Sequence, residues 1–586
     1  MPVDLNDIAD RLSKTSPLTS SSDDKLIIAL DFGTTYSGIA YCFTNQRDCT
    51  PISIKNWPGA ESPDAPKIPT LIKYDKENPD SFTWGAALNN QSDGIVGVKL
   101  LLDVKQEIPI YLPVRNVKKD ISALPKPPVE VAADFIGAIY GHAISEISNK
   151  FSKDYVALCH KEYVLSDQKV PAVWSDAAKD ATLKAAEIAG LSPVHLIKEP
   201  EAAALWTAKK MDRRLNKNDC FIVCDAGGGT VDLISYQVEA ALPRLEVKEI
   251  VPGTGGMAGS LGLNKLFSSE VENLVGEDQW LQLKKSRAFH LASKQFDREI
   301  KRSFRGGIEE EYFVNFPTAK LEDDLDFGLE ASTWRLTGIE LKRIFDPLIN
   351  DILRLINDQV QRIRLKQMDD GIKGIFLVGG FGSNQYLIER VRKDQPNIDI
   401  LQPPDAWAAI AKGAALSRLP GEAIVTSTSA TRHYGVQSWH VHDPVLDAGQ
   451  PTIPWYDGTT RSLCMTWYIN IGDNLVRDQT IKFPFCRNLN SIDDPSWLIF
   501  HNTLFECEER TAPRHPLSSG MFGSNCILKS DMSTVPKSKF EKQIDPKGLS
   551  YWQLHYDLVV SLKSAVMKFS LEIDGESFGT VNAKYN

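Results

Sequence analysis

Asp219 to Val238 reads DCFIVCDAGGGTVDLISYQV, and Lys25 to Phe43 reads KLIIALDFGTTYSGIAYCF. Each stretch has an apolar, β-branched run, then Asp-x-Gly with further Gly and Thr, and then a second strand-like run. Glycine in the bend permits a positive φ, so each stretch predicts a β-hairpin with a tight turn. The repetition of the pattern predicts a duplicated α/β architecture with two similar lobes that face each other.

The two bends also suit the binding of a triphosphate. Gly and Thr allow backbone N–H groups to approach phosphate oxygens, and Thr hydroxyls add donors. Asp31 and Asp225 end the strand before each bend, where a carboxylate can hold Mg²⁺ mainly through its waters. An internal carboxylate on an apolar strand would be costly without such a partner.

A plain hairpin turn is the alternative interpretation of each bend. For either hairpin alone, the plain turn is the favoured interpretation. The presence of two such bends in matching register favours a phosphate site instead. The motif GxxxxGK[ST] is absent, and each bend is followed by a strand instead of a helix. These features exclude a P-loop and a dinucleotide-binding fingerprint.

Composition sets broad limits on the class of protein. A chain of 586 residues is too long for one core, and its 42% apolar residues are enough for sizeable cores. The net charge of -10 argues against nucleic acid as the main partner. No apolar run of membrane-span or signal-peptide length is present, so neither a membrane nor export is expected. The nine cysteines lack regular spacing and predict free thiols in a reducing compartment.

His440 and His442 form a weak metal signal, because alternate residues of a strand share one face and Asp443 follows. Two half-exposed strand histidines without a metal are the favoured interpretation.

Hydrophobic spacing predicts strands and amphipathic helices after each hairpin. Strands are expected over Val164 to Val173 and Ile372 to Val378. A capping box of Thr337 and Glu340 predicts the start of a helix that reaches about Leu365. The other expected helices are Val129 to Asn149, Asp176 to Ala189 ended by Gly190, Glu201 to Lys209, one from about Asn384, and Pro403 to Ala415.

Composition changes near residue 420. Gly421 to Ser429 is a Ser/Thr-rich stretch that we interpret as a connector. Short alternating segments follow and predict a β-rich domain, a sandwich being the expected form; they are Leu463 to Ile471, Gln479 to Pro484, Trp497 to Phe505, Trp552 to Leu562 and Val566 to Ile573. The expected organisation is a disordered tail over 1–24, a first domain over 25–420 with lobes of about 25–215 and 216–420, and the β-rich domain over 421–586.

Several motifs resemble those of one superfamily. DFGTTYSGIAY resembles the first phosphate loop of the actin, sugar-kinase and heat-shock ATPase superfamily, DAGGGTVD resembles the second, and IFLVGGFGS resembles the turn that holds adenosine. VPAVWSDAAKDATLKAAEIAGL followed by IKEPEAAAL resembles the 70-kDa heat-shock chaperones, and PPDAWAAIAKGAA is similar to the helix that ends their ATPase domain. GGFGSNQYL and KLLLD resemble the branch called heat-shock 70 kDa protein 12-like. The resemblance covers about Lys25 to Leu419.

The resemblance implies a two-lobed actin-like ATPase, built from duplicated ribonuclease-H-like subdomains, that binds ATP or ADP with Mg²⁺. A smaller β-sandwich would follow it. Asp31, Glu199 and Asp225 are implied to organise Mg²⁺ through its waters. Lys99 matches best the lysine that positions the attacking water, with Lys105 as a weaker substitute. Glu199, Asp225 and Thr230 are implied to act with it in catalysis. The implied phosphate-loop residues are Asp31, Gly33, Thr34, Thr35, Tyr36, Gly227, Gly228, Gly229, Thr230 and Asp232, and Gly259 falls in a further phosphate-side turn.

The adenine side departs from the family. Arg302 matches one arginine of the family's adenine clamp, but Ser383 stands where the other is usual. Arg298 and Arg305 stand where the family usually has an acidic and a small hydroxyl residue. Gly379, Gly380 and Asp405 are the other implied nucleotide-binding residues.

Pro171 and Lys179 match the family's proline switch and its basic partner, which relay the nucleotide state. A strand-terminal proline and a solvated helix lysine are nearly equal alternatives.

MTWYINIGDNLVRDQTIKFPF resembles the start of the family's substrate-binding β-domain. The family's leucine-aspartate linker, helical lid and acidic tail motif are not recognisable. We therefore do not expect every step of the chaperone cycle.

Three functions remain open from sequence. The first is an Mg-dependent, slow, chaperone-like ATPase that couples nucleotide state to binding of extended polypeptides. The second is a nucleotide-regulated binding module with negligible turnover, and the third is a small-molecule kinase on the same fold. An actin-like filament former is less favoured, because the β-rich domain would obstruct stacking. We expect a cytoplasmic protein, with the nucleus as the alternative location, and co-chaperones stay undecided.

Overall fold

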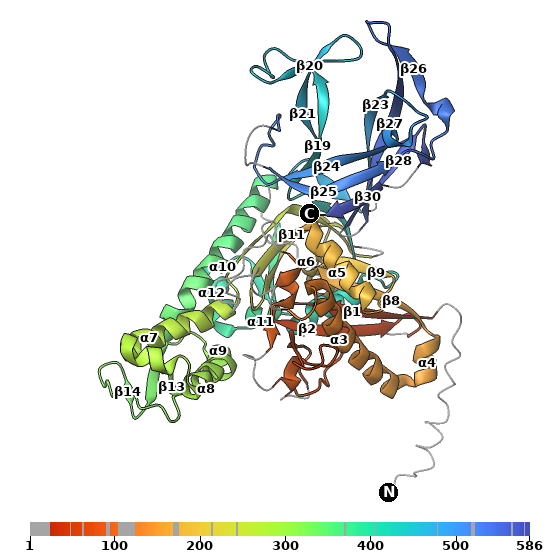
Figure 1. The fold of residues 1–586 in the computed structure, drawn as a ribbon. Coiled ribbons are helices and arrows are strands. Elements are labelled where there is room, and N and C mark those ends of the chain that lie inside the picture. The colour runs from red at the N-terminus through yellow and green to blue at the C-terminus, as the bar shows by residue number, and fades with distance from the viewer. Residues whose placement is uncertain are drawn as a thin grey trace.

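The computed structural model describes residues 24–46, 49–60, 64–88, 94–103, 124–167, 175–211, 215–241, 244–367, 371–403, 405–477, 479–516, 522–563, 566–578 and 581–585. The tail predicted over residues 1–24 lies outside the described residues, except for Asp24 itself. Lys105 and Pro171 also lie outside them. Figure 1 shows the C-terminal strands gathered at one end of the molecule, beyond the helices and sheets formed by the earlier residues. No helix among the described residues combines the length and apolar character needed to span a bilayer.

The first hairpin lies at the centre of a mixed sheet with the strand order β3-β2-β1-β8-β9. β2 runs antiparallel to β1, whereas β8 is parallel to β1 and β9 is parallel to β8. The strands are β1 (Lys25–Asp31), β2 (Tyr36–Phe43), β3 (Ile52–Ser53), β8 (His160–Asp167) and β9 (Val194–Lys198), with β4 (Ile68–Pro69) also paired to β2.

The second hairpin builds a sheet with the same order and directions, β12-β11-β10-β16-β17. β10 and β11 are antiparallel, with Asp225 opposite Asp232, and β16 is parallel to β10. The strands are β10 (Cys220–Ala226), β11 (Val231–Ala240), β12 (Glu246–Gly256), β16 (Ile372–Val378) and β17 (Asp399–Leu401). Both predicted hairpins are therefore confirmed, and the sequence repeat corresponds to a repeated sheet topology.

Two helices lie between these sheets, α6 (Glu199–Met211) and α13 (Ala409–Leu416). Their buried side chains form one core with the facing strands of both sheets, including Ile27 of the first sheet and Phe221 of the second. The two helices cross very closely at Gly413. A Cβ on Gly413 would lie 1.7 Å from the carbonyl oxygen of Ala202, so only glycine permits this approach. This packing fixes the distance between the two sheets and therefore between the two bends.

Other helices cover the outer face of each sheet. α3 (Pro128–Phe151) and α5 (Asp176–Ile188) share a core with the first sheet. α7 (Leu261–Leu283), α10 (Gly338–Lys366) and α12 (Gln385–Asp394) share a core with the second. The capping box predicted at Thr337 and Glu340 is confirmed at the start of α10.

Smaller elements complete this part of the chain. α8 (Arg287–Gln295), the π-helical η4 (Phe296–Ile300) and α9 (Lys301–Ser303) follow α7, and a sheet of β13 (Glu311–Asn315), β14 (Leu329–Glu330) and β15 (Thr333–Thr337) follows them. The others are β5 (Leu71–Tyr74), β6 (Phe82–Trp84), β7 (Ile95–Val96), η1 (Gly85–Ala87), η3 (Val98–Leu102), α4 (Lys153–Leu158), α11 (Gly379–Gly382) and η5 (Ala406–Ala408).

The predicted connector over Gly421 to Ser429 is wrong for most of its length. β18 (Ile424–Ser429) pairs in parallel with β12, and β22 (Asn474–Val476) pairs with β18. Its alternate residues are buried, since Val425, Ser427 and Ser429 face the interior. Small polar residues therefore form a strand here because tertiary pairing outweighs their weak β-propensity.

After β18 the described regular elements are strands and two short 3₁₀ turns, η6 (Pro495–Trp497) and η7 (Lys537–Lys539). Two antiparallel sheets share one core of side chains from both, including Leu504 and Leu558. One contains β20 (Thr452–Pro454), β21 (Thr460–Ile469), β19 (His433–Val441), β24 (Ile499–Cys507), β25 (Phe522–Asp531) and β30 (Val581–Tyr585). The other contains β23 (Thr480–Leu489), β27 (Ser550–Lys563), β28 (Val566–Ile573), β29 (Glu576–Phe578) and β26 (Glu541–Ile544).

Two predicted boundaries differ from the structure. The helix expected from Pro403 starts at Ala409, after the 3₁₀ turn of η5, because Asp405 adopts a left-handed φ of 60° that interrupts a helix. The strand expected to begin at Val164 begins at His160, and residues beyond Asp167 up to 174 lie outside the described range.

Candidate nucleotide-binding site

A cavity of about 670 Å³ lies where the two hairpin bends meet. Its volume falls within the range of small-molecule sites. The sequence-predicted residues that line it are Asp31, Gly33, Thr34, Thr35, Tyr36, Glu199, Asp225, Gly227, Gly228, Gly229, Thr230, Asp232, Arg302, Gly379, Gly380 and Ser383. The structure therefore brings most of the predicted residues together, whatever their individual roles.

The two bends face each other at contact distance. A Cβ on Gly228 would lie 2.7 Å from the hydroxyl oxygen of Thr35, so only glycine leaves room for the opposite bend. Gly259 does not line the cavity. It packs behind the second bend, where its Cβ would lie 2.3 Å from the carbonyl carbon of Gly229. Gly259 thus supports the bend from behind, and its predicted phosphate contact stays untested.

Hydrogen bonds hold the first bend in place. The side-chain hydroxyl of Thr70 donates to the carbonyl oxygen of Gly33 at 2.8 Å, and the Thr70 backbone N–H donates to the carbonyl of Thr35 at 2.9 Å. The hydroxyl of Ser166, on β8, donates to Asp31 Oδ1 at 3.0 Å. These bonds occupy backbone carbonyls and orient the carboxylate without using the N–H groups of the bend.

Three buried carboxylates, Asp31, Glu199 and Asp225, line the cavity. Burial, reinforced by the charge of Glu199, raises the pKa of Asp225 well above its usual value. Burial also raises the pKa of Glu199, although the ammonium of Lys99 opposes this shift. The raised pKa values of Asp225 and Glu199 fit a site for a divalent cation such as Mg²⁺, which would favour the charged forms of both carboxylates.

Lys67 is one site residue that the sequence did not reveal. Its ammonium lies 2.6 Å from Asp31 Oδ2, its side chain is 9% exposed, and it lines the cavity. Burial alone would lower the pKa of Lys67, but the carboxylates of Asp31, Asp225 and Glu199 raise it above the usual value. Lys67 therefore stays charged. Nothing in the spacing of APKIPT signals this placement, which depends on β4 pairing with β2.

Lys99, the predicted catalytic lysine, lies behind the cavity. Its side chain is 1% exposed, it pairs with Glu199 Oε1 at 2.9 Å, and it is not among the lining residues. In this structure Lys67, not Lys99, presents its ammonium to the cavity.

Thr230 and Asp232 form a pair at the second bend. The hydroxyl of Thr230 donates to Asp232 Oδ2 at 3.0 Å, and both residues line the cavity. Asp232 lies directly across the hairpin from Asp225. The bend therefore holds an acidic group on each of its two strands.

The outer part of the cavity is lined by a charged helical segment. Burial would raise the pKa of Asp297, but the ammonium of Lys301 lowers it below its usual value. Asp297, Lys301 and Arg302 line the cavity, whereas Arg298 and Arg305 are not among its lining residues. The π-helical turn of η4 adds a residue to the turn, which changes the face on which each side chain lies. Arg298 stands where the family usually has an acidic residue. The acidic residue that lines this cavity is Asp297, one position earlier.

Trp407 is a second residue that sequence did not single out. It lines the cavity, and its ring meets that of Tyr36 edge-on with centroids 5.8 Å apart. Asp405, the predicted nucleotide-binding residue nearby, instead pairs with Lys412 at 2.6 Å and precedes the turn that carries Trp407. Ser383 does line the cavity, with its hydroxyl donating to the carbonyl of Gly380 at 2.7 Å.

Lys179 lies away from the cavity. It is buried and forms an ion pair with Asp176 on the first turn of α5, so the alternative of a solvated lysine is wrong. Its proposed partner Pro171 lies outside the described residues.

Replacing Gly379 by alanine is expected to lower the free energy of unfolding by about 2 kcal/mol and to weaken nucleotide binding. Gly379 has a φ of 79°, and a Cβ there would lie 2.3 Å from Asp225 Oδ1. Thermal denaturation with and without Mg-ATP measures both effects.

Gly421→Ala is the matched control, because Gly421 has a φ of 78° but no atom within 4 Å of a Cβ. It should lose stability from the backbone alone and keep its nucleotide response. Equal nucleotide responses in both variants would contradict the placement of Gly379 against Asp225.

Several known proteins are similar to this chain. Residues 160–418 match the family model described as Hsp70 protein. Heat shock 70 kDa protein 12A of Mus musculus is 25% identical over 515 residues, covering 72% of this chain and 74% of the relative. Heat shock 70 kDa protein 12B of Homo sapiens is 23% identical, with the same coverage. Chaperone protein DnaK of Mycoplasma mycoides is 25% identical over 67% of this chain and 58% of its own length.

The matched region includes Glu199, the second hairpin, the charged helical segment and α13. These similarities support nucleotide binding and, in general terms, ATP hydrolysis. The chain is therefore similar to the Hsp70 protein family over residues 160–418, and to heat shock 70 kDa proteins 12A and 12B over 72% of its length.

Proposed function

We propose that this protein is a slow, Mg²⁺-dependent ATPase of the actin-like, two-lobed type, which couples its nucleotide state to polypeptide binding by the C-terminal β-sandwich. The observation that carries the proposal is the cavity, in which two equivalent hairpin bends meet over three buried carboxylates and a buried lysine. The repeated strand order of the two sheets supports the view that each sheet is the centre of one lobe.

Each group of cavity residues has a separate role in the proposed hydrolysis. The glycines of both bends offer backbone N–H groups to phosphate oxygens, and Thr34 and Thr35 offer hydroxyls. Mg²⁺, held by Asp31, Glu199 and Asp225, supplies positive charge against the triphosphate when it is bound. Lys67 lies beside Asp31, from which its ammonium can reach a phosphate oxygen. Catalysis would consist mainly of positioning and charge compensation.

A chain of contacts supports coupling between the cavity and the C-terminal sheets. Glu199 pairs with Lys99 on η3, and Asp103 at the end of η3 accepts a hydrogen bond from the backbone N–H of Ser175 at 3.0 Å. Ser175 caps α5. A change in the position of Glu199 would therefore be transmitted through η3 to the first turn of α5.

Asp176, the next residue, contacts the C-terminal sheets directly. Its Oδ2 accepts hydrogen bonds from the hydroxyl of Tyr434 at 3.2 Å and from the side-chain amide of Asn525 at 2.9 Å. Its other oxygen pairs with Lys179. Asp176 is thus the point at which the proposed switch lysine and two strands of the β-sandwich, β19 and β25, meet.

The Tyr434→Phe variant is expected to reduce the effect of ATP on peptide release while leaving hydrolysis unchanged. Losing one buried hydrogen bond costs about 1 kcal/mol, which corresponds to roughly a fivefold smaller acceleration. The dissociation rate of a fluorescent, extended apolar peptide, measured with ADP and with ATP, tests this expectation.

Tyr468→Phe provides the control, because Tyr468 is buried in the same sheets but its hydroxyl has no hydrogen-bond partner among the described residues. That variant should release peptide as the wild type does. If ATP has no effect on the wild-type release rate, or if Tyr434→Phe keeps the full effect, the coupling route is overturned.

A nucleotide-regulated binding module with negligible turnover is the second candidate. The observation that favours it is the position of Lys99, which pairs with Glu199 behind the cavity instead of lining it. This candidate predicts a clear increase in melting temperature with ATP together with no detectable phosphate release.

A further inference from the structure

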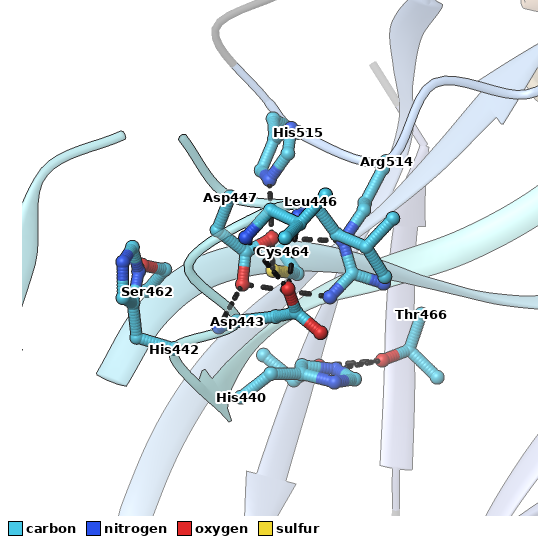
Figure 2. A network of polar contacts seen from close by, with 12 residues as sticks. His440, His442, Asp443, Leu446, Asp447, Ser462, Cys464, Thr466, Arg514 and His515 are labelled. Atoms are coloured by element: carbon cyan, nitrogen blue, oxygen red, sulfur yellow. Dashed lines mark hydrogen bonds and ion pairs between the residues drawn. The ribbon is translucent and has the colours of Figure 1, made fainter. Parts of the chain in front are cut away.

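A compact polar cluster lies in the C-terminal sheets, far in sequence from every residue of the nucleotide cavity. Asp447 follows β19, Cys464 belongs to β21, and His515 lies between β24 and β25. One ligand atom from each of these residues lies within 4.8 Å of the other two. Figure 2 shows the three side chains pointing toward one another from separate segments of the chain.

The carboxylate of Asp447 is the centre of the cluster. Its Oδ1 lies 2.8 Å from His515 Nε2, 2.8 Å from Arg514 Nε and 3.7 Å from Cys464 Sγ. The side chain of Asp447 is 0% exposed, Cys464 is 1% exposed, and the side chain of His515 is 12% exposed. The carboxylate, the thiol and the imidazole therefore converge in a largely buried place, which borders solvent at Arg514, whose side chain is 41% exposed.

The second carboxylate oxygen of Asp447 is held separately. The backbone N–H of Asp443 donates to Oδ2 at 2.9 Å, and a terminal nitrogen of Arg514 lies 3.5 Å from it. These donors orient the carboxylate so that Oδ1 faces the thiol and the imidazole. Outer hydrogen bonds of this kind fix the first ligands of many protein metal sites.

The chemistry of the three ligands selects among metals. A thiolate and an imidazole disfavour Mg²⁺ and Ca²⁺, which take oxygen ligands. Cysteine, histidine and aspartate are the three residue types that Zn²⁺ uses, at about 2.0 to 2.3 Å from each ligand atom. Ligand atoms around a tetrahedral ion of this size lie roughly 3 to 4 Å apart, close to the 2.8 and 3.7 Å observed here.

We propose that Asp447 Oδ1, Cys464 Sγ and His515 Nε2 bind a Zn²⁺ ion, with a water molecule as the fourth ligand. On binding, the thiol loses its proton to solvent, and the imidazole coordinates in its neutral form. Arg514 withdraws from Oδ1 and keeps its contact with Oδ2. The thiolate and the carboxylate balance the charge of the ion, and Arg514 remains the one outer cation among the described residues in contact with Asp447.

The two histidines that the sequence marked as a weak metal signal are not part of this set. His440 Nε2 bonds with the hydroxyls of Ser438 and Thr466, and His442 Nδ1 bonds with the hydroxyl of Ser462. The ion would instead join three separate segments of the chain, so it would fasten two loops to β21. This site is independent of the proposed nucleotide chemistry.

Cobalt substitution of the full chain tests the proposal. The protein is dialysed against a chelator and then titrated with Co²⁺ alone. We expect one Co²⁺ per chain, a thiolate-to-cobalt absorption band, visible bands of a tetrahedral ion, and loss of all of these on addition of Zn²⁺. Elemental analysis of the protein before chelation should find about one zinc per chain.

Cys464→Ser should abolish the thiolate band, and His515→Ala should weaken Co²⁺ binding by at least tenfold. Cys486→Ser and His555→Ala are the matched controls, because Cys486 is exposed on β23 and His555 is exposed on β27. Both should retain the wild-type spectrum. Absence of a thiolate band in the folded wild-type protein, or its persistence in Cys464→Ser, would mean a metal-free hydrogen-bonded cluster and would overturn the proposal even if a variant fails to fold.

Discussion

Replacing Lys67 by alanine is expected to lower the rate constant for ATP hydrolysis by about 100-fold or more. Removal of one preorganised donor from a developing negative charge typically costs a factor of 10² to 10³. Lys67 is the one lysine of the described chain that both lines the cavity and pairs with Asp31, and the surrounding carboxylates keep it charged. Single-turnover phosphate release from Mg-ATP measures the effect.

Stability must be measured alongside, because the variant leaves Asp31 without its ion pair. Melting temperatures with and without ADP separate unfolding from lost chemistry. Lys67→Arg should not restore the rate, since a planar guanidinium does not replace a compact ammonium. Lys55→Ala, which removes an exposed lysine with a 3.7 Å contact to Asp64, should hydrolyse ATP as the wild type does.

The comparison with Lys99→Ala decides between the two lysines. If Lys67→Ala keeps its rate within threefold while Lys99→Ala loses hydrolysis, the lysine inferred from the family pattern is the catalytic one. The position of Lys67 at the cavity would then be structural.

Asp225→Asn is expected to abolish the Mg²⁺ dependence of nucleotide binding and at the same time to stabilise the nucleotide-free protein. Asp225 is buried beside Glu199, and its pKa is well above the usual value. Asparagine removes a charge that is costly at neutral pH without a cation. The expected gain is on the order of 1 kcal/mol, and ATP hydrolysis should fall by at least about 100-fold.

The pH dependence follows from the direction of this pKa shift. Because the folded-state pKa of Asp225 is raised, the folded protein binds more protons than the unfolded chain. The contribution of Asp225 to stability is therefore present at acidic pH and lost as pH rises through the folded-state pKa. The stability gained by Asp225→Asn should accordingly grow as pH rises above about 4, the usual pKa of an aspartate, as followed by thermal denaturation without nucleotide. A gain that shrinks with rising pH would contradict the shift.

Local patterns were enough to predict the parts of the site that lie within single segments. The two hairpins, the capping box at Thr337 and the strand Ile372–Val378 depend on turn residues and apolar spacing, which adjacent residues determine. The bends were expected to face each other because they repeat, and the contact between Thr35 and Gly228 has that arrangement.

The other features of the site and of the fold depended on tertiary pairing, which no local sequence pattern encodes. Lys67 reaches Asp31 only because β4 pairs with β2, and Lys99 does not line the cavity but pairs with Glu199, which does. Asp297 enters the cavity through a π-helical turn, which shifts the helix face without a mark in the sequence. Ser427 and Ser429 form part of a strand because β12 and β22 offer free edges on either side of β18.

Single-turnover hydrolysis of radiolabelled Mg-ATP by the purified full chain, beside Asp225→Ala, tests the central claim most directly. We predict slow phosphate release by the wild type that requires Mg²⁺ and falls to background in Asp225→Ala. Phosphate release by the wild type that is no faster than in Asp225→Ala, despite bound ATP, would contradict the claim that this cavity hydrolyses ATP.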